Sequence, residues 1–198
     1  GIACPMTVLG SDGAGVRRLA RTADRLVIKD RFGSGSSGFA VVRADGVRAA
    51  LDQRGQDPDL LIVQPFLTGV EYGMDVIGDL TGTGAVAGVL ARRKDGSAQG
   101  VTTRVVTEDP APFRPLAESI AHVIGPQGPV DVDLVRSATG LHVLDVNPRF
   151  GGGYPFSHCA GSDVPGYLVA ELLGAPAPPG WDTCRIGLTI GRYDSFVP

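Results

Sequence analysis

The chain has 198 residues, of which 43% are hydrophobic and 20% are charged, so it can bury a core without help from metals or disulfides. Its formal charge of -3 argues against a general nucleic-acid binder. Its three cysteines are too few and too widely spaced for a disulfide framework or a CxxC metal site. Because the sequence contains neither a long apolar run nor a signal peptide, we expect a cytoplasmic protein without nucleic-acid or membrane partners.

The hydrophobic pattern predicts a mixture of helices and strands, with a long antiparallel meander in the middle of the chain. Helices are expected to begin near Asp12, Asp45, Pro112 or Pro115, and Asp163. Strands are expected at residues 26–29, 39–42, 60–63, 70–77, 85–90, 101–107, 130–135, 141–146 and 185–190, with a polar tract at 92–99. This order predicts an α+β fold.

A glycine-rich loop, Gly33-Ser-Gly35-Ser-Ser-Gly38, lies between the first two of these strands and fits the pattern G-x-G-x-x-G. The dinucleotide-binding interpretation fails because a strand follows the loop where that fingerprint needs a helix. A Walker loop fails because no Gly-Lys-Ser/Thr follows. A flap that covers phosphates therefore remains, with Lys29 just before it as a cation for a negative ligand. The alternative is a surface hairpin with an exposed lysine.

Polar side chains alternate with apolar ones on the two strands of a predicted hairpin. Asp131 and Asp133 share a face of the first strand, as Asp145 and Asn147 do in the second. If the turn centres on Thr139, Asp133 lies opposite Asp145 and Asp131 lies opposite Asn147. Such acidic side chains repel one another without cations, and their oxygens suit Mg²⁺ that bridges phosphates. The alternative is two solvated strand faces with incidental acids.

Four motifs follow one another along nearly the whole chain: Lys29, the loop 33–38, Gln64-Pro-Phe-Leu-x-Gly-x-Glu71, and Asp145-x-Asn-Pro-Arg149. The string LDVNPRFGGGYP at residues 144–155 is the most specific. Together they resemble the ATP-grasp superfamily, nearest its carbamoyl-phosphate-synthetase-like branch. The resemblance implies two α+β lobes with mainly antiparallel sheets that grip ATP. It assigns residues 1–67 to the small lobe with the flap and residues 68–198 to the large lobe with the metal-binding hairpin.

The resemblance also implies a set of nucleotide-binding residues. Lys29 would bind the α- and β-phosphates and take part in catalysis. The flap over the phosphates would consist of Gly33, Ser34, Gly35, Ser36, Ser37 and Gly38. The adenine edge would be lined by Gln64, Pro65, Phe66 and Leu67. Glu71 would hold the ribose hydroxyls.

The remaining roles implied by the resemblance concern the metal and the reaction. Asp133, Asp145 and Asn147 would ligate Mg²⁺ or Mn²⁺, and Arg149 would be catalytic by steadying the γ-phosphate or an acyl phosphate. The implied activity is that of an ATP-dependent ligase that activates a small carboxylate as an acyl phosphate, which an amine-type nucleophile then attacks. The family usually has Glu at the position of Asp145 and Gln or Glu at that of Asp133, so both side chains are one methylene shorter here.

Several alternatives stay open. Full-length members carry an upstream domain that is absent before Gly1, so we expect an upstream domain, a partner chain or a homodimer to complete the unit. In the first interpretation the chain is an ATP-grasp ligase, which is either active or inactive as this fragment. In the second it is a non-catalytic ATP-binding module or the partner subunit of a split ligase. A phosphotransferase whose acceptor is not a carboxylate is a third interpretation. A group of basic residues either meets a carboxylate substrate or forms a solvated charge run: Arg92, Arg93, Lys94 and Arg104.

Overall fold

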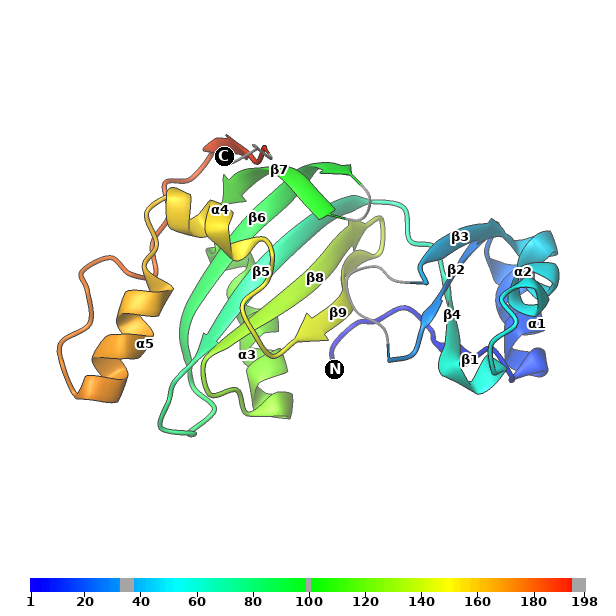
Figure 1. Cartoon of the computed structure of the whole chain (residues 1–198), viewed down its shortest axis with the longest axis horizontal. Coiled ribbons are helices and arrows are strands. Elements are labelled where there is room, and N and C mark those ends of the chain that lie inside the picture. Colours follow the sequence, from blue (N-terminus) through cyan, green and yellow to red (C-terminus); the bar gives the residue numbers. More distant parts are fainter. Residues whose placement is uncertain (33–37, 99–100, 194–198) are drawn as a thin grey trace, which may run out of the picture. The chain divides into compact units, whose positions relative to one another are not determined.

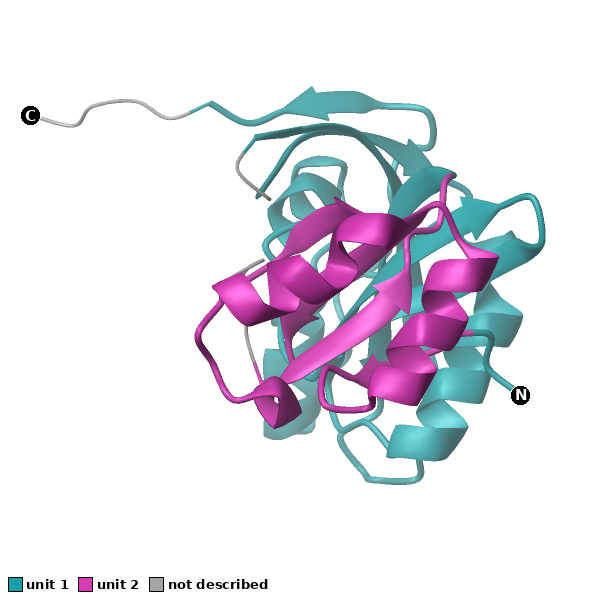
Figure 2. Cartoon of the chain, turned by 90° about the vertical axis from the view of Figure 1, so that its right-hand side faces the viewer, with its two compact units in different colours: residues 1–3, 69–198 teal, residues 4–68 magenta. Residues whose placement is uncertain are grey.

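The computed structural model describes residues 1–32, 38–98 and 101–193. The chain divides into two compact units, one of residues 4–68 and one of residues 1–3 and 69–198 (Figure 2). The resemblance to the ATP-grasp superfamily predicts a boundary after residue 67, with residues 1–3 in the small lobe. Those three residues pack with the larger unit, where the amide of Val143 donates a 2.9 Å hydrogen bond to the carbonyl of Ala3.

The smaller unit is an antiparallel sheet of order β1-β4-β2-β3 with two helices on one face. Leu26 and Ile28 of β2 pack against those helices, so Val27 and Lys29 project to the other face. Asp12 caps α1 as predicted, because its carboxylate accepts a 2.9 Å hydrogen bond from the amide of Gly15. The elements are β1 (Val8–Leu9), α1 (Gly13–Thr22), β2 (Arg25–Asp30), β3 (Ala40–Arg43), η1 (Ala44–Gly46), α2 (Val47–Gln53), η2 (Pro58–Leu60) and β4 (Leu61–Pro65).

The larger unit is an antiparallel sheet of order β10-β7-β6-β5-β8-β9 (Figure 1). Its strands are β5 (Val70–Gly78), β6 (Val86–Ala98), β7 (Val101–Glu108), β8 (Pro129–Ser137), β9 (Gly140–Asn147) and β10 (Thr189–Gly191). Its helices are η3 (Ala111–Phe113), α3 (Arg114–Ile124), α4 (Tyr154–Cys159) and α5 (Val164–Leu173). The two sheets with their helices make this an α+β fold, as predicted.

Both faces of the larger sheet carry helices. Met74 and Val76 of β5 belong to the core that α3 covers. Ile77 of the same strand packs instead with Tyr154 of α4 and Tyr167 of α5. The side chains of β5 thus alternate between the α3 face and the face that carries α4 and α5.

Three segments differ from the predicted elements. The strand expected at 85–90 continues through most of the polar tract, so that Arg92 to Ala98 form the second half of β6. Pairing with β5 and β7 outweighs the weak strand preference of this tract. The glycine-rich loop that follows Arg149 ends in the short helix α4, and the last strand is limited to Thr189–Gly191. In the part of the chain that the structure describes, no helix is both long and apolar enough to cross a bilayer.

Candidate functional site

The hairpin of β8 and β9 has the predicted pairing, with Asp133 opposite Asp145 and Asp131 opposite Asn147. The turn itself is one residue tighter than expected, because Ser137 pairs with Gly140. An irregularity after Asp133 restores the register by leaving Leu144 as an extra residue in β9. A regular hairpin from this turn would place Leu144 opposite Asp133. The predicted register is therefore confirmed, but it depends on a β-bulge.

Charged side chains of four strands gather on the face of the larger sheet that carries α4 and α5. Asp131 and Asp133 lie opposite Asp75 and Gly73 of β5, and Gly73 lies opposite Arg92 of β6. Directly opposed residues in antiparallel strands project to the same face. We call this set the charged face: Glu71, Asp75, Arg92, Lys94, Asp131, Asp133, Asp145 and Asn147.

Arg92 lies at the buried end of the charged face, where its side chain is only 3% exposed. It pairs with both carboxylate oxygens of Asp75, which is as deeply buried. Its second terminal nitrogen lies 3.4 Å from Asp131 Oδ1. Burial raises the pKa of Asp131 to about 6, the charge of Asp133 acts in the same direction, and Arg92 opposes both effects.

The predicted metal ligands lie at the more exposed end. Asp133 accepts a 2.6 Å hydrogen bond from Lys94 Nζ, and Asp145 accepts one of 3.3 Å from the side-chain amide of Asn147. Within the described ranges, no group of three or more His, Cys, Asp or Glu side chains is placed to hold a metal ion. The predicted ligands are two carboxylates and an amide, so they do not make up such a group.

A loop of three glycines covers part of this face. A Cβ on Gly151 would overlap the carboxylate of Asp131, and a Cβ on Gly153 would overlap the guanidinium of Arg92. A Cβ on Gly152 would meet nothing within 4 Å. The same loop follows Arg149, whose Nη1 lies 3.6 Å from Asp131 Oδ2 and donates a 2.9 Å hydrogen bond to the Phe150 carbonyl. Two of the glycines are thus required by close packing.

The predicted phosphate and adenine residues lie in the smaller unit. Lys29 lies in β2 on the sheet face away from the helices. The Gln64 side chain is buried and donates a 2.8 Å hydrogen bond to Thr7 Oγ1. The guanidinium of Arg25 lies over the ring of Phe66, with Arg25 Cζ 4.2 Å from the ring centre. Pro65 ends β4, and Leu67 is half-buried just beyond it.

Most of the predicted flap, Gly33, Ser34, Gly35, Ser36 and Ser37, lies outside the described residues. Gly38 is described, and it has a φ of 68° and packs against the carboxylate of Asp30. A side chain at this position would be strained by both the backbone conformation and this contact. The loop therefore returns to β3 through a position that favours glycine.

The four basic residues of the polar tract and β7 separate into two groups. Arg92 and Lys94 belong to the charged face, where they meet Asp75, Asp131 and Asp133. The other two form surface ion pairs instead: Arg93 with Asp95 and Glu108, and Arg104 with Asp95. Glu71, the predicted ribose ligand, is exposed near the start of β5.

Asp75 belongs to the charged face, but none of the sequence motifs predicts a role for it. A single acidic residue inside the apolar run from Met74 to Ile77 is the signal that identifies it, because a buried carboxylate needs a partner. Arg92 is that partner.

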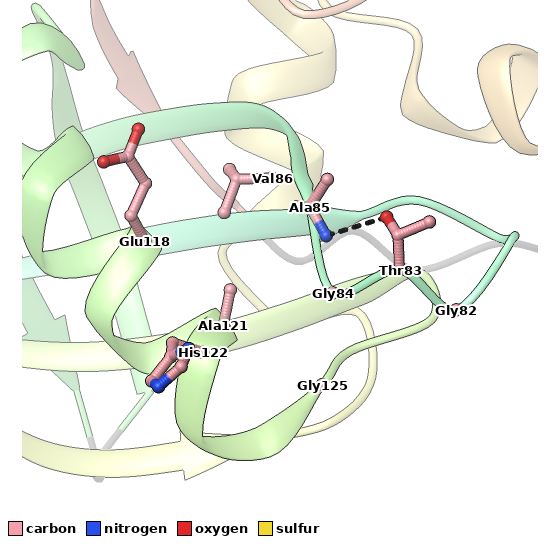
Figure 3. Close-up of a pocket in the computed structure, with 9 residues that line it drawn as sticks. All are labelled: Gly82, Thr83, Gly84, Ala85, Val86, Glu118, Ala121, His122 and Gly125. Carbon is pink, nitrogen blue, oxygen red and sulfur yellow. Dashed lines mark hydrogen bonds between the residues drawn. The ribbon is translucent and has the colours of Figure 1, made fainter.

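A pocket of about 290 Å³ lies beside α3 (Figure 3). Glu118 and His122 of α3 border it on one side, and the tip of the β5–β6 hairpin borders it on the other. The tip is held by a 3.2 Å hydrogen bond from the amide of Ala85 to Thr83 Oγ1. None of the predicted site residues lines this pocket.

A match to a known family model shows which family the chain belongs to. A family model described as "ATP-grasp in the biosynthetic pathway with Ter operon" matches residues 57–186, about two thirds of the chain. The chain belongs to this ATP-grasp family. The matched segment contains the motif at 64–71 and the β8–β9 hairpin with Arg149, whereas Lys29 and the flap precede it. No curated protein matches the chain in sequence.

Solved structures share the fold at low sequence identity. The biotin carboxylase domain of 2-oxoglutarate carboxylase from Hydrogenobacter thermophilus, a dimer in complex with MgADP, ADP and bicarbonate, has a TM-score of 0.70 and 14% identity over 96% of this chain and 46% of its own. N5-carboxyaminoimidazole ribonucleotide synthetase from Thermus thermophilus has a TM-score of 0.66 and 18% identity, over 90% of this chain and 50% of its own.

The ATP-grasp ligase PsnB, in complex with the precursor peptide PsnA2 and AMPPNP, has a TM-score of 0.64 and 19% identity. The match covers 88% of this chain and 54% of PsnB. The chain therefore spans about half the length of these structural neighbours. At this identity they show the ATP-grasp fold.

Proposed function

We propose that the chain is the ATP-binding part of an ATP-dependent carboxylate-amine ligase, which activates a small carboxylate as an acyl phosphate with Mg-ATP. The observation that carries this proposal is the β8–β9 pairing, which places Asp133 opposite Asp145 and Asp131 opposite Asn147 on one face. Arg149 follows two residues later and lies 3.6 Å from Asp131. Acidic oxygens beside an exposed guanidinium suit a metal-bound phosphate chain.

The residues proposed to hold the nucleotide follow the family motifs. Lys29 binds the α- and β-phosphates under the flap of residues 33–38, and residues 64–67 line the adenine edge. Glu71 holds the ribose hydroxyls from the start of β5. Family membership supports the roles of residues 64–67 and Glu71, which lie in the matched segment. Lys29 and the flap precede that segment, and their support is the motif order together with the shared fold of neighbours solved with ADP or AMPPNP.

The donor set at the exposed end of the charged face fits Mg²⁺ or Mn²⁺. Asp133, Asp145 and Asn147 offer hard oxygen ligands from neighbouring strands, and Mg²⁺ commonly binds through one or two carboxylates together with phosphates. The metal would neutralise the phosphate charge during transfer. In this proposal Asp133 exchanges its hydrogen bond with Lys94 for the metal.

Arg149 is proposed to contact the γ-phosphate and the acyl phosphate formed from it. Its guanidinium is about half exposed, so it is available to a ligand while Asp131 and the Phe150 carbonyl hold it in place. Charge stabilisation and positioning supply most of the rate in such phosphoryl transfers. An upstream domain, a partner chain or a second copy would complete the substrate site.

Trapping with hydroxylamine tests this function. The chain is incubated with Mg-ATP, hydroxylamine and a panel of small amino, hydroxy and dicarboxylic acids. An acyl phosphate gives a hydroxamate in equal amount to ADP for one class of acid, and the Arg149→Met variant gives neither. ADP formed without hydroxamate would point to another phosphate acceptor.

A non-catalytic ATP-binding module is the second candidate. The observation that favours it is Lys94, which already neutralises Asp133 without a metal. In that case Mg-ATP binds, and no acid in the panel stimulates release of ADP.

A further inference from the structure

We infer that Arg92 is a positioning residue of the candidate site: it holds Asp131, and through Asp131 the guanidinium of Arg149, in one arrangement. The inference rests on the proposed function, in which Arg149 meets the transferred phosphate. Arg92 itself is buried and is not proposed to contact a ligand.

The contacts of Arg92 join four segments of the larger unit. Its guanidinium forms a two-pronged pair with Asp75 of β5, lies 3.4 Å from Asp131 of β8, and donates a 3.3 Å hydrogen bond to Ser157 Oγ of α4. A planar guanidinium that meets a carboxylate with two nitrogens has a fixed orientation. Because its charge cannot be removed by loss of a proton, this buried group needs a carboxylate partner, and Asp75 meets it with both oxygens while Asp131 lies 3.4 Å away.

Asp131 connects the buried arginine to the exposed one. Its Oδ1 lies 3.4 Å from Arg92, and its Oδ2 lies 3.6 Å from Arg149. The side chain of Asp131 is 12% exposed, whereas that of Arg149 is 54% exposed. The position of Arg149 therefore depends on a carboxylate that is itself held from the protein interior.

Glycines enclose the guanidinium from two sides. Gly73 lies opposite Arg92 in the neighbouring strand, and a Cβ there would come within 3.1 Å of Arg92 Nε. Gly153 lies over it from the loop that follows Arg149, and a Cβ there would overlap the guanidinium. Gly153 has a φ of -88°, a conformation open to any residue, so the space rather than the backbone requires glycine. The loop that follows Arg149 is thus in close packing contact with the guanidinium of Arg92.

Hydrogen exchange tests the packing without any ligand. We expect the Arg92→Lys and Gly153→Ala variants of the 198-residue chain to exchange the amides of residues 149–156 about tenfold faster at neutral pH. Gly152→Ala is the matched control, since its Cβ enters open space, and it should exchange like the parent. Thermal unfolding verifies that each variant is folded. Unchanged exchange in Arg92→Lys, or equal acceleration in Gly152→Ala, would overturn the inference.

Nucleotide selectivity tests the positioning role. If Arg149 meets the γ-phosphate, Arg149→Lys should weaken Mg-ATP binding about tenfold relative to Mg-ADP. Arg92→Lys should reproduce this loss of ATP-over-ADP selectivity, and the double variant should lose little more. A purely structural role would weaken ATP and ADP equally and give additive effects, which would contradict the inference. If the parent binds no Mg-ATP, the proposed function fails, and the exchange result alone decides whether Arg92 positions the loop.

Discussion

Lys94 Nζ lies 2.6 Å from Asp133 Oδ1, although their strands β6 and β8 are separated in the sheet by β5. Gly73 of β5 lies directly opposite Asp133 and carries no side chain on this face. The lysine therefore reaches across the intervening strand and neutralises one of the two carboxylates predicted to hold the metal.

The first prediction concerns competition between this lysine and a divalent cation. Lys94→Met should tighten Mn²⁺ binding about tenfold, because the cation no longer has to displace a resident positive charge from Asp133. Calorimetric titration with Mn²⁺ in the absence of nucleotide measures the change. Arg93→Met is the matched control, since it removes the same charge from the adjacent position, where the guanidinium pairs with Asp95 and Glu108. Equal tightening in both variants would argue against direct competition at Asp133.

The second prediction concerns pH and Asp131, whose pKa is raised to about 6 from an ordinary value of 3.8. The folded state then holds this proton more tightly than the unfolded state, so its contribution to stability is greatest below about pH 4. The contribution falls as the pH rises to about 6 and is constant above that. Asp131→Asn removes the titration.

Urea unfolding between about pH 4 and 7.5 in the presence of EDTA measures this effect. The free energy of unfolding of the parent, minus that of Asp131→Asn, should decrease as the pH rises from about 4 to 6.5. Titration of the acids that do not interact with Asp131 is common to both proteins and cancels in the difference. A difference that stays constant across this range would show that Asp131 is not perturbed.

The third prediction concerns the contribution of the Gln64 side chain to the stability of the smaller unit. Because the buried Gln64 side chain donates a hydrogen bond to Thr7, Gln64→Met should lower the free energy of unfolding by about 1 kcal/mol. Gln53→Met, at an exposed position of α2, is the control and should change stability by less than about 0.5 kcal/mol. Urea denaturation compares the two. Equal stability of both variants would show that the hydrogen bond to Thr7 contributes nothing.

The sequence predicts the register of the β8–β9 hairpin correctly, but it does not predict the β-bulge on which that register depends. Alternation of acidic and apolar residues indicates which side chains share a face, since the period of a strand is two residues. It does not reveal the extra residue, Leu144, that compensates for the tight turn between Ser137 and Gly140. A bulge has no composition signal of its own here, and only the pairing of both strands determines its place.

The buried ion pair of Arg92 with Asp75 could not be predicted from the sequence. The polar tract that begins at Arg92 resembles a solvated segment, because nothing local indicates that the guanidinium is covered. Its burial depends on Asp75, 17 positions earlier, and on Asp131, 39 positions later. Such long-range charge compensation overrides local polarity and is visible only in the folded sheet.

Calorimetric titration of the chain with ATP, with and without Mg²⁺, tests whether the β8–β9 hairpin binds a metal together with the nucleotide. We expect binding that requires Mg²⁺ and that is lost in both Lys29→Ala and Asp145→Ala. Binding of equal strength in EDTA, or retained in Asp145→Ala, would contradict the assignment of the β8–β9 hairpin as the place where metal and nucleotide meet.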